Sequence, residues 1–175
     1  MAGEGIPAYF WGQARRLGQD ILDVGAEKAA SDSANFSWRN AQIALWGGRV
    51  AGMLLAYRLA DTPDPQELQG CPAFVRPLIE LEQCVPGSFY VNMLATYAKF
   101  RGRGVGTALM ELVDTLARES GCALSSIEVF EQNTTALRLY QGLGYEEAAR
   151  RRVVPHESHA MSGDVILLTR SVRGS

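Results

Sequence analysis

A glycine-rich turn between a strand pattern and a helix pattern constrains the fold most. The turn spans residues 101–106 and has the sequence RGRGVG. Before it, residues 89–96 read FYVNMLAT, a run of strand-forming residues, and after it apolar residues recur at helical spacing from Val105 to Leu116. Gly121 then provides a natural helix end. The segment therefore predicts a strand, a tight turn and a helix in succession, as in proteins of the α/β class.

The first half of the chain combines helical patterns with a hairpin. Residues 6–11 form a short apolar segment and residues 20–30 carry apolar residues at near-helical spacing, so both are expected to be helical. Residues 41–59 hold two apolar runs joined by two adjacent glycines, a pair that tight hairpins favour. Residues 61–87 begin as a loop rich in Pro and Asp and continue as a short helix, which is typical of an insertion and makes them a candidate lid. We expect one domain over residues 1–175, because this length suffices for a single core.

The second half alternates strands and helices. Residues 126–130 read SIEVF, a short strand, and a helix should follow that is capped by Asn133 and ended by Gly144. Two last strands are expected at residues 145–154 and 165–169. This order predicts a mixed α/β sandwich with antiparallel hairpins on either side of a central parallel strand pair.

Charge and composition exclude several classes of protein. Seventeen Lys and Arg face nineteen Asp and Glu, a net charge of −2, so electrostatic capture of nucleic acid is not expected. No stretch approaches the roughly 18 apolar residues of a membrane span, and the N-terminal sequence shows no charged leader, so no membrane association is expected. Three cysteines, Cys71, Cys84 and Cys122, indicate neither a disulfide framework nor a zinc site. A cytoplasmic protein is predicted.

The turn has the chemistry of an anion site. Gly102, Gly104 and Gly106 allow the backbone to turn tightly and expose successive N–H groups, and the following helix directs the positive end of its dipole to the same point. Arg101 and Arg103 can add charge-assisted hydrogen bonds. A phosphate or pyrophosphate is the ligand that such a turn favours.

Two other phosphate-binding motifs do not match the residues of the turn. A dinucleotide fingerprint requires glycine where the chain has Thr107, and a P-loop requires a Gly-Lys-Ser/Thr ending that is absent. A nucleotide-binding protein is therefore disfavoured. A turn that uses its glycines for geometry alone, and binds nothing, stays open on these residues.

Two separated segments resemble the signature motifs of the GNAT family of N-acetyltransferases. The first, LATYAKFRGRGVGTALM over residues 94–110, matches the family's Arg/Gln-x-x-Gly-x-Gly/Ala pattern at Arg101, Gly104 and Gly106. The second, EQNTTALRLYQGLGY over residues 131–145, matches at Asn133, Ala136, Leu139-Tyr140 and Gly144-Tyr145. The resemblance covers roughly residues 88–148, with weaker support from the hairpin at 41–59. The two motifs stand in the family's order, which makes the resemblance specific.

The resemblance implies a GNAT-like sandwich, in which a central, mostly antiparallel sheet contains a splayed parallel strand pair flanked by helices. It also implies acetyl-CoA as cosubstrate. The pantetheine arm would meet backbone groups of Leu94, Ala95 and Thr96 in the gap between the splayed strands. The pyrophosphate would lie on the turn, and Asn133 would contact the arm or the thioester. The turn residues in this role are Arg101, Gly102, Arg103, Gly104, Val105, Gly106 and Thr107.

The family reaction, direct attack of an amine on a thioester, requires a proton acceptor and a proton donor. Tyr140 matches the family tyrosine near the sulfur and is the expected general acid. Glu128 is the first choice for the general base, because some members carry a glutamate at the matching strand position; an outward-facing polar residue is the alternative. Tyr90 and Asn92 project from one face of the preceding strand and could line the acceptor pocket or position a water. The resemblance also places Tyr90 at a second position where family members can carry the catalytic glutamate, so a mechanism that uses a glutamate at that position is absent here.

Several other residues have weaker claims. Glu80 and Glu82 could attract a cationic amine, although charge pairs on short helices mostly face solvent. His156 and His159 have no accompanying Cys or acidic ligand pattern, so a loop and no metal site is expected. Family domains usually begin with a strand before the segment that starts here at Ile6, and the sequence has no strand pattern there; either the strand is lost or the assigned start is late.

The resulting expectation is an N-acetyltransferase that transfers the acetyl group of acetyl-CoA to a primary amine of a small molecule or peptide within a ternary complex. The alternative is a non-catalytic acyl-CoA binder of the same fold, a sensor or scaffold. Asn133 and Tyr140 together favour the enzyme. Edge strands in this fold often pair, so a homodimer is a possible assembly.

Overall fold

The computed structural model, which describes residues 5–157 and 160–172, is built on one six-stranded sheet. The strand order is β1-β2-β3-β4-β6-β5, and all neighbours are antiparallel except the central pair β3–β4. The strands are β1 (Ala41–Trp46), β2 (Arg49–Arg58), β3 (Phe89–Thr96), β4 (Leu124–Phe130), β5 (Glu146–Arg152) and β6 (Asp164–Ser171). The predicted mixed α/β fold with a parallel pair at its centre is confirmed.

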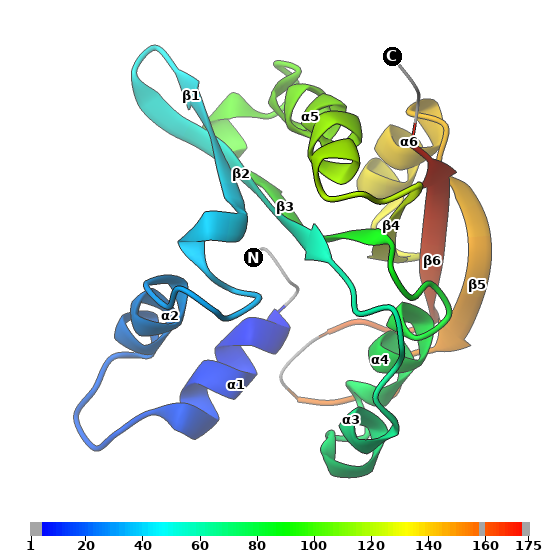
Figure 1. Cartoon of the computed structure of the whole chain (residues 1–175). Helices are drawn as coiled ribbons and strands as arrows, with labels where there is room; N and C mark the ends of the chain where they lie inside the picture. Colours follow the sequence, from blue (N-terminus) through cyan, green and yellow to red (C-terminus); the bar gives the residue numbers. More distant parts are fainter. Residues whose placement is uncertain (1–4, 158–159, 173–175) are drawn as a thin grey trace.

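Helices cover both faces of the sheet (Figure 1). Helices α5 and α6 lie on one side, and α1, α2, α3 and α4 lie on the other. Their bounds are α1 (Ile6–Ala14), α2 (Ile21–Ala29), α3 (Pro65–Gly70), α4 (Arg76–Glu82), α5 (Val105–Glu119) and α6 (Thr134–Gly142), with 3-10 turns η2 (Trp38–Asn40) and η3 (Ala98–Phe100). Within residues 5–40 the structure has helices and no strand before β1.

Alternation along the strands divides the core into two clusters. In β6, Ile166 and Leu168 face the α5–α6 side, whereas Val165 and Leu167 face the α4 side. The first cluster is anchored by Met110 of α5, which has no exposed surface. Because side chains alternate between the faces of a strand, one sheet serves both cores.

Local sequence signals explain most helix boundaries. The side chain of Asp20 accepts a hydrogen bond from the backbone N–H of Leu22 at 2.7 Å and so caps α2. Gly47 and Gly48 both have positive φ (57° and 74°), the conformation that a two-residue hairpin turn between β1 and β2 requires. At the contact between α1 and α2, a Cβ on Gly25 would come within 2.9 Å of the Trp11 ring, so only glycine allows this close packing.

The prediction for the start of the 61–87 segment was wrong. Its Pro- and Asp-rich start was predicted as a loop, yet α3 forms there because Pro65 occupies the first helical turn and the Asp64 side chain accepts a hydrogen bond from Gln66 N–H at 2.9 Å. The following helix, α4, contacts β5 and β6. Its Leu81 has no exposed surface, so α4 is part of the core on this face.

Candidate active site

The central parallel pair separates after a short joined section. Three residue pairs connect β3 to β4, from Phe89 opposite Ser125 to Val91 opposite Ile127. At the joined end, the hydroxyl oxygens of Ser88 and Ser126 lie 2.7 Å apart in the buried interior. Beyond Val91, β3 stays paired with β2 but no longer with β4. The sheet therefore has a gap along the second half of β3.

The backbone of β3 presents polar groups to this gap. The Ala95 carbonyl faces β2, since a Cβ on Gly52 of that strand would lie 2.5 Å from its oxygen. Successive residues of a strand direct their backbone groups to opposite edges, so the groups of Leu94 and Thr96 face the gap. The Nε of Arg101 reaches the Thr96 carbonyl oxygen at 3.4 Å. The gap thus ends at the glycine-rich turn.

The turn leads directly into α5. Gly102 and Gly104 have φ of 71° and 78°, a backbone conformation that favours glycine, and no atom lies within 4 Å of a Cβ built on either. The first helical hydrogen bond runs from Ala108 N–H to the Gly104 carbonyl oxygen, so the N–H groups of the first turn have no partner within the helix. Arg103 lies over the Trp46 ring, with 5.6 Å from guanidinium carbon to ring centroid. The turn is open and electropositive.

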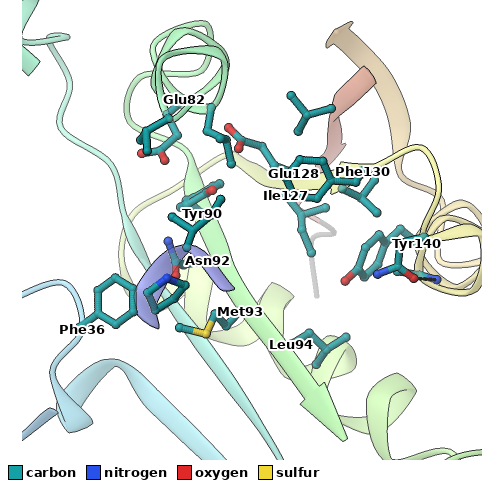
Figure 2. A pocket seen from close by; sticks show the side chains of 18 of the residues that line it. Phe36, Glu82, Tyr90, Asn92, Met93, Leu94, Ile127, Glu128, Phe130 and Tyr140 are labelled. Atoms are coloured by element: carbon teal, nitrogen blue, oxygen red, sulfur yellow. Dashed lines mark hydrogen bonds between the residues drawn. The ribbon is translucent and has the colours of Figure 1, made fainter. Parts of the chain in front are cut away.

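A cavity of about 220 Å³ opens beside the gap, on the face covered by α1 and α4. Figure 2 shows its labelled side chains converging from β3, β4, α4 and α6. Six of the lining residues are predicted site residues: Tyr90, Asn92, Leu94, Glu128, Asn133 and Tyr140. The cavity therefore brings together side chains from both sequence motifs and from the strand between them.

Glu128 lines the cavity, and its carboxylate lies on the side of Glu82 and Tyr90 (Figure 2). Both carboxylate oxygens are buried, and neither has a hydrogen-bond partner among the described residues. Burial, and then the charge of Glu82, raise the pKa of the Glu128 carboxyl well above its usual range, and the nearby Tyr90 hydroxyl opposes this shift. The alternative of an outward-facing strand residue is therefore wrong for Glu128.

Glu82 of α4 is a cavity residue that sequence analysis ranked low. It lines the same cavity as Glu128, whereas Glu80 points elsewhere and pairs with Arg151 at 3.0 Å. Burial, and then the charge of Glu67, raise the pKa of Glu82 to about 7, while a hydrogen bond from Tyr90 lowers it. Glu82 follows the cavity residue Leu78 by four positions and hence shares its helix face.

Tyr90 and Asn92 share one face of β3, as their spacing predicted. Tyr90 is 3% exposed, and burial followed by the charge of Glu128 raises the pKa of its hydroxyl well above the usual value. The Asn92 amide nitrogen donates a hydrogen bond to the Tyr57 hydroxyl at 3.1 Å, and the rings of Tyr57 and Tyr90 meet edge to face at 5.8 Å. Tyr57 fixes both residues, and sequence analysis did not identify it.

Tyr140 and Asn133 bound the cavity from the α6 side. Tyr140 is 5% exposed, and burial raises the pKa of its hydroxyl above the usual value, so the group keeps its proton at neutral pH. In Figure 2 the Tyr140 oxygen points toward the cavity, on the side opposite Phe36. Asn133 caps α6, and its side-chain oxygen accepts from the backbone N–H of Ala136.

His156 is separate from this cavity. His156 stacks on the Phe74 ring, with centroids 4.1 Å apart, and His159 lies outside the described residues. In the described ranges, no group of three or more His, Cys, Asp or Glu side chains is arranged to hold a metal ion. In the same ranges, no helix has the length and apolar character to cross a membrane.

Sequence comparisons identify relatives of the chain. A model of the acetyltransferase (GNAT) family matches residues 13–145. The uncharacterized N-acetyltransferase YdgE of Bacillus subtilis is 36% identical over 56 residues, 32% of this chain and 36% of that protein. N-alpha-acetyltransferase 30 of Saccharomyces cerevisiae is 37% identical over 57 residues, 32% of each chain. The chain thus matches about a third of the length of these curated relatives.

Solved structures share the fold over almost the whole chain. A crystallised acetyltransferase has a TM-score of 0.63 at 16% identity, covering 94% of this chain and 85% of its own. An agmatine N-acetyltransferase has a TM-score of 0.63 at 19% identity, covering 97% and 89%. The polyamine N-acetyltransferase of Drosophila melanogaster has a TM-score of 0.62 at 19% identity, covering 90% and 84%.

These neighbours support the fold, and the family model, which spans most of the chain, defines the family. GNAT acetyltransferases take their acetyl group from acetyl-CoA and transfer it to amines. The chain belongs to the acetyltransferase (GNAT) family.

Proposed function

We propose that the protein transfers the acetyl group of acetyl-CoA to a primary amine of a small molecule or peptide by direct attack in a ternary complex. One observation carries the proposal: the gap between β3 and β4 runs from the glycine-rich turn to a cavity holding a buried, unpartnered carboxylate and a buried tyrosine hydroxyl. An extended thioester bound in such a gap would place its reactive end at the cavity, where an amine can approach from the other side.

Backbone groups would hold most of the cosubstrate. The edge of β3 facing the gap, at Leu94 to Thr96, offers hydrogen bonds to the amides of a pantetheine arm, with the Ala95 groups directed to β2 instead. The unpartnered N–H groups that begin α5 and the nearby Arg101 and Arg103 suit a pyrophosphate. The turn residues concerned are Gly102, Gly104, Val105, Gly106 and Thr107. Asn133 would meet the arm from the α6 side.

The chemical step needs two groups. The amine nitrogen attacks the thioester carbonyl carbon, so that a C–N bond forms and the C–S bond breaks. Glu128 would take the proton that the nitrogen loses, and its raised pKa brings the carboxyl toward the range of an effective general base at neutral pH. Tyr140 would give its proton to the departing thiolate, or stabilise it by hydrogen bonding. Tyr90 and Asn92, the alternative to Glu128, would act by positioning a water.

Two further features are consistent with this proposal. Acetyltransferases for agmatine and polyamines, which are small amines, and an N-alpha-acetyltransferase are among the proteins similar to this chain. The cysteines Cys71, Cys84 and Cys122 are all free thiols, as is usual for a protein of the reducing cytoplasm, where we propose that it acts.

Calorimetry with acetyl-CoA, followed by an assay for free thiol release with a broad amine panel, tests the function. Binding together with amine-dependent thiol release and an acetylated product of the expected mass is the predicted result. Binding without thiol release for any amine would indicate the non-catalytic acyl-CoA binder. Failure to bind acetyl-CoA while ATP or NAD binds would contradict both.

A further inference from the structure

Two carboxylates from separate elements meet at one end of the cavity. Glu82 comes from α4 and Glu128 from β4, and the Tyr90 side chain lies between them (Figure 2). The charges of both carboxylates raise the pKa of the Tyr90 hydroxyl, and the charge of Glu82 also raises the pKa of Glu128, so the three groups lie close together. The Glu128 oxygens are buried without a hydrogen-bond partner among the described residues, so a cationic donor group placed beside this acidic cluster of Glu82, Tyr90 and Glu128 would be stabilised.

The part of the cavity wall formed by Phe36, α1 and Leu78 is apolar. The side opposite Tyr140 is formed by Phe36, and α1 and α4 add further apolar side chains. These are Ile6, Pro7 and Phe10 of α1, and Leu78 of α4. Apart from the two carboxylates, no charged side chain lines the cavity within the described residues. A second positive charge on the ligand, or the amide groups of a peptide, would face this wall without a partner, which is unfavourable.

We propose that the acceptor is an alkylamine or arylalkylamine with a single positive charge, whose nitrogen is received by the acidic cluster and whose body lies on the apolar wall. This inference rests on the proposed function and narrows it to a substrate class. Glu82 then acts as a specificity residue, because it attracts the ammonium group before reaction, while Glu128 receives the proton that the nitrogen loses. Chain length and ring size are limited by the cavity of about 220 Å³.

Matched acceptors test the substrate class. The assay measures thiol release from acetyl-CoA with hexylamine, 2-phenylethylamine, 1,6-diaminohexane and an alanine-initiated tripeptide. We expect kcat/KM for the two monoamines to exceed that for the diamine and the tripeptide by at least about tenfold. A preference for the diamine or the tripeptide would overturn the inference and leave the N-acetyltransferase function standing. Thiol release with none of the amines would refute the function as well.

A pair of variants on one helix tests Glu82 itself. Glu82→Gln should raise KM for hexylamine at least about tenfold with a much smaller change in kcat, because the ammonium group loses its charged partner. Glu80→Gln is the control, since Glu80 faces Arg151 outside the cavity, and its KM should equal that of the wild type. Inhibition by 1-hexanol, a neutral analogue, should be unchanged in Glu82→Gln, which verifies an intact cavity. Equal KM values for hexylamine in the two variants would remove Glu82 from this role.

Discussion

The side-chain oxygen of Asn133 accepts a hydrogen bond from the backbone N–H of Ala136 at 3.2 Å. The residue that the second motif assigns to the cosubstrate therefore also begins α6, the helix that carries Tyr140. Its two roles use different atoms, because the oxygen is engaged in the cap and the amide N–H₂ is left for a ligand. Substitutions can separate them.

Asn133→Ala should lower the free energy of unfolding by about 1 kcal/mol through loss of the cap and should raise KM for acetyl-CoA. Asn133→Asp should keep the cap, because aspartate is an equally good N-cap residue, but it lacks the N–H₂ donor. Urea denaturation and steady-state kinetics on both variants provide the comparison. If Asn133→Asp has the wild-type KM, the amide does not contact the cosubstrate.

Tyr140→Phe should lower kcat while leaving the Kd for acetyl-CoA nearly unchanged, because only the proton donor is removed. A loss of roughly tenfold to a hundredfold is expected for a general acid. Tyr145→Phe is a suitable control, since that ring lies 6.2 Å from the Tyr140 ring and its hydroxyl bonds to Ser125 instead of facing the cavity. Single-turnover measurements should show equal rates for Tyr145→Phe and wild type. An unaltered rate in Tyr140→Phe would exclude the acid role.

Glu128→Gln preserves the shape of the side chain and removes its basicity. We expect kcat to fall by about two orders of magnitude at neutral pH, with acetyl-CoA binding retained. Asn92→Ala serves as the competing test, because it removes one of the two residues that could position a water. A larger loss in Asn92→Ala than in Glu128→Gln would transfer the base role to the Tyr90 and Asn92 pair.

Ionisation of Glu82 should couple stability to pH. Its pKa is raised from 4.5 to about 7, so between these values the unfolded chain loses the proton while the folded chain keeps it. The free energy of unfolding contributed by this group therefore falls as pH rises through this window, by at most roughly 3 kcal/mol. Glu82→Gln should exceed the wild type in stability at pH 8 and match it below pH 4.5, as measured by urea denaturation.

The groups facing Glu82 define the control for this titration. They are Glu67 of α3, Tyr90 of β3, Glu128 of β4 and Tyr57 of β2. The raised pKa of Glu128 also makes the free energy of unfolding fall as pH rises. This contribution persists in Glu82→Gln and is removed in Glu128→Gln, so comparing the two variants separates the two groups. Stability differences between Glu82→Gln and wild type that do not depend on pH would contradict the prediction.

Substitution by alanine at two glycines of the turn should reduce stability in one case and cosubstrate binding in the other. Gly104→Ala places an L-residue at φ 78°, which costs about 1–2 kcal/mol of stability. At Gly106, a Cβ would meet Leu139, Thr96 and Leu94 at 3.5–3.9 Å, ordinary contact distances, so Gly106→Ala should fold normally. Its methyl group would narrow the gap beside Thr96 and raise KM for acetyl-CoA roughly tenfold. Thermal melts and kinetics on both variants measure the contrast; a normal KM in Gly106→Ala would move the arm away from this position.

Sequence patterns predicted the framework because its signals are local. Alternating glycines, an Asn cap and adjacent hairpin glycines each act within a few residues, and the bounds of β3 at Phe89–Thr96 are as predicted. Glu82 was ranked low because its environment arises only when α4 packs over β5 and β6, an arrangement that no local pattern encodes. Tyr57 was missed for the same reason, since its partner Asn92 is 35 residues away in the chain.

The short junction between β3 and β4 divides the sheet mechanically. Three residue pairs and the Ser88–Ser126 contact join a half formed by β1, β2 and β3 to a half formed by β4, β6 and β5. A molecule bound in the gap would hydrogen-bond where strand pairing is missing and would act as a clamp across the two halves. The bound donor would thus stabilise the contact between the two halves of the sheet, and this stabilisation would be lost each time the product leaves.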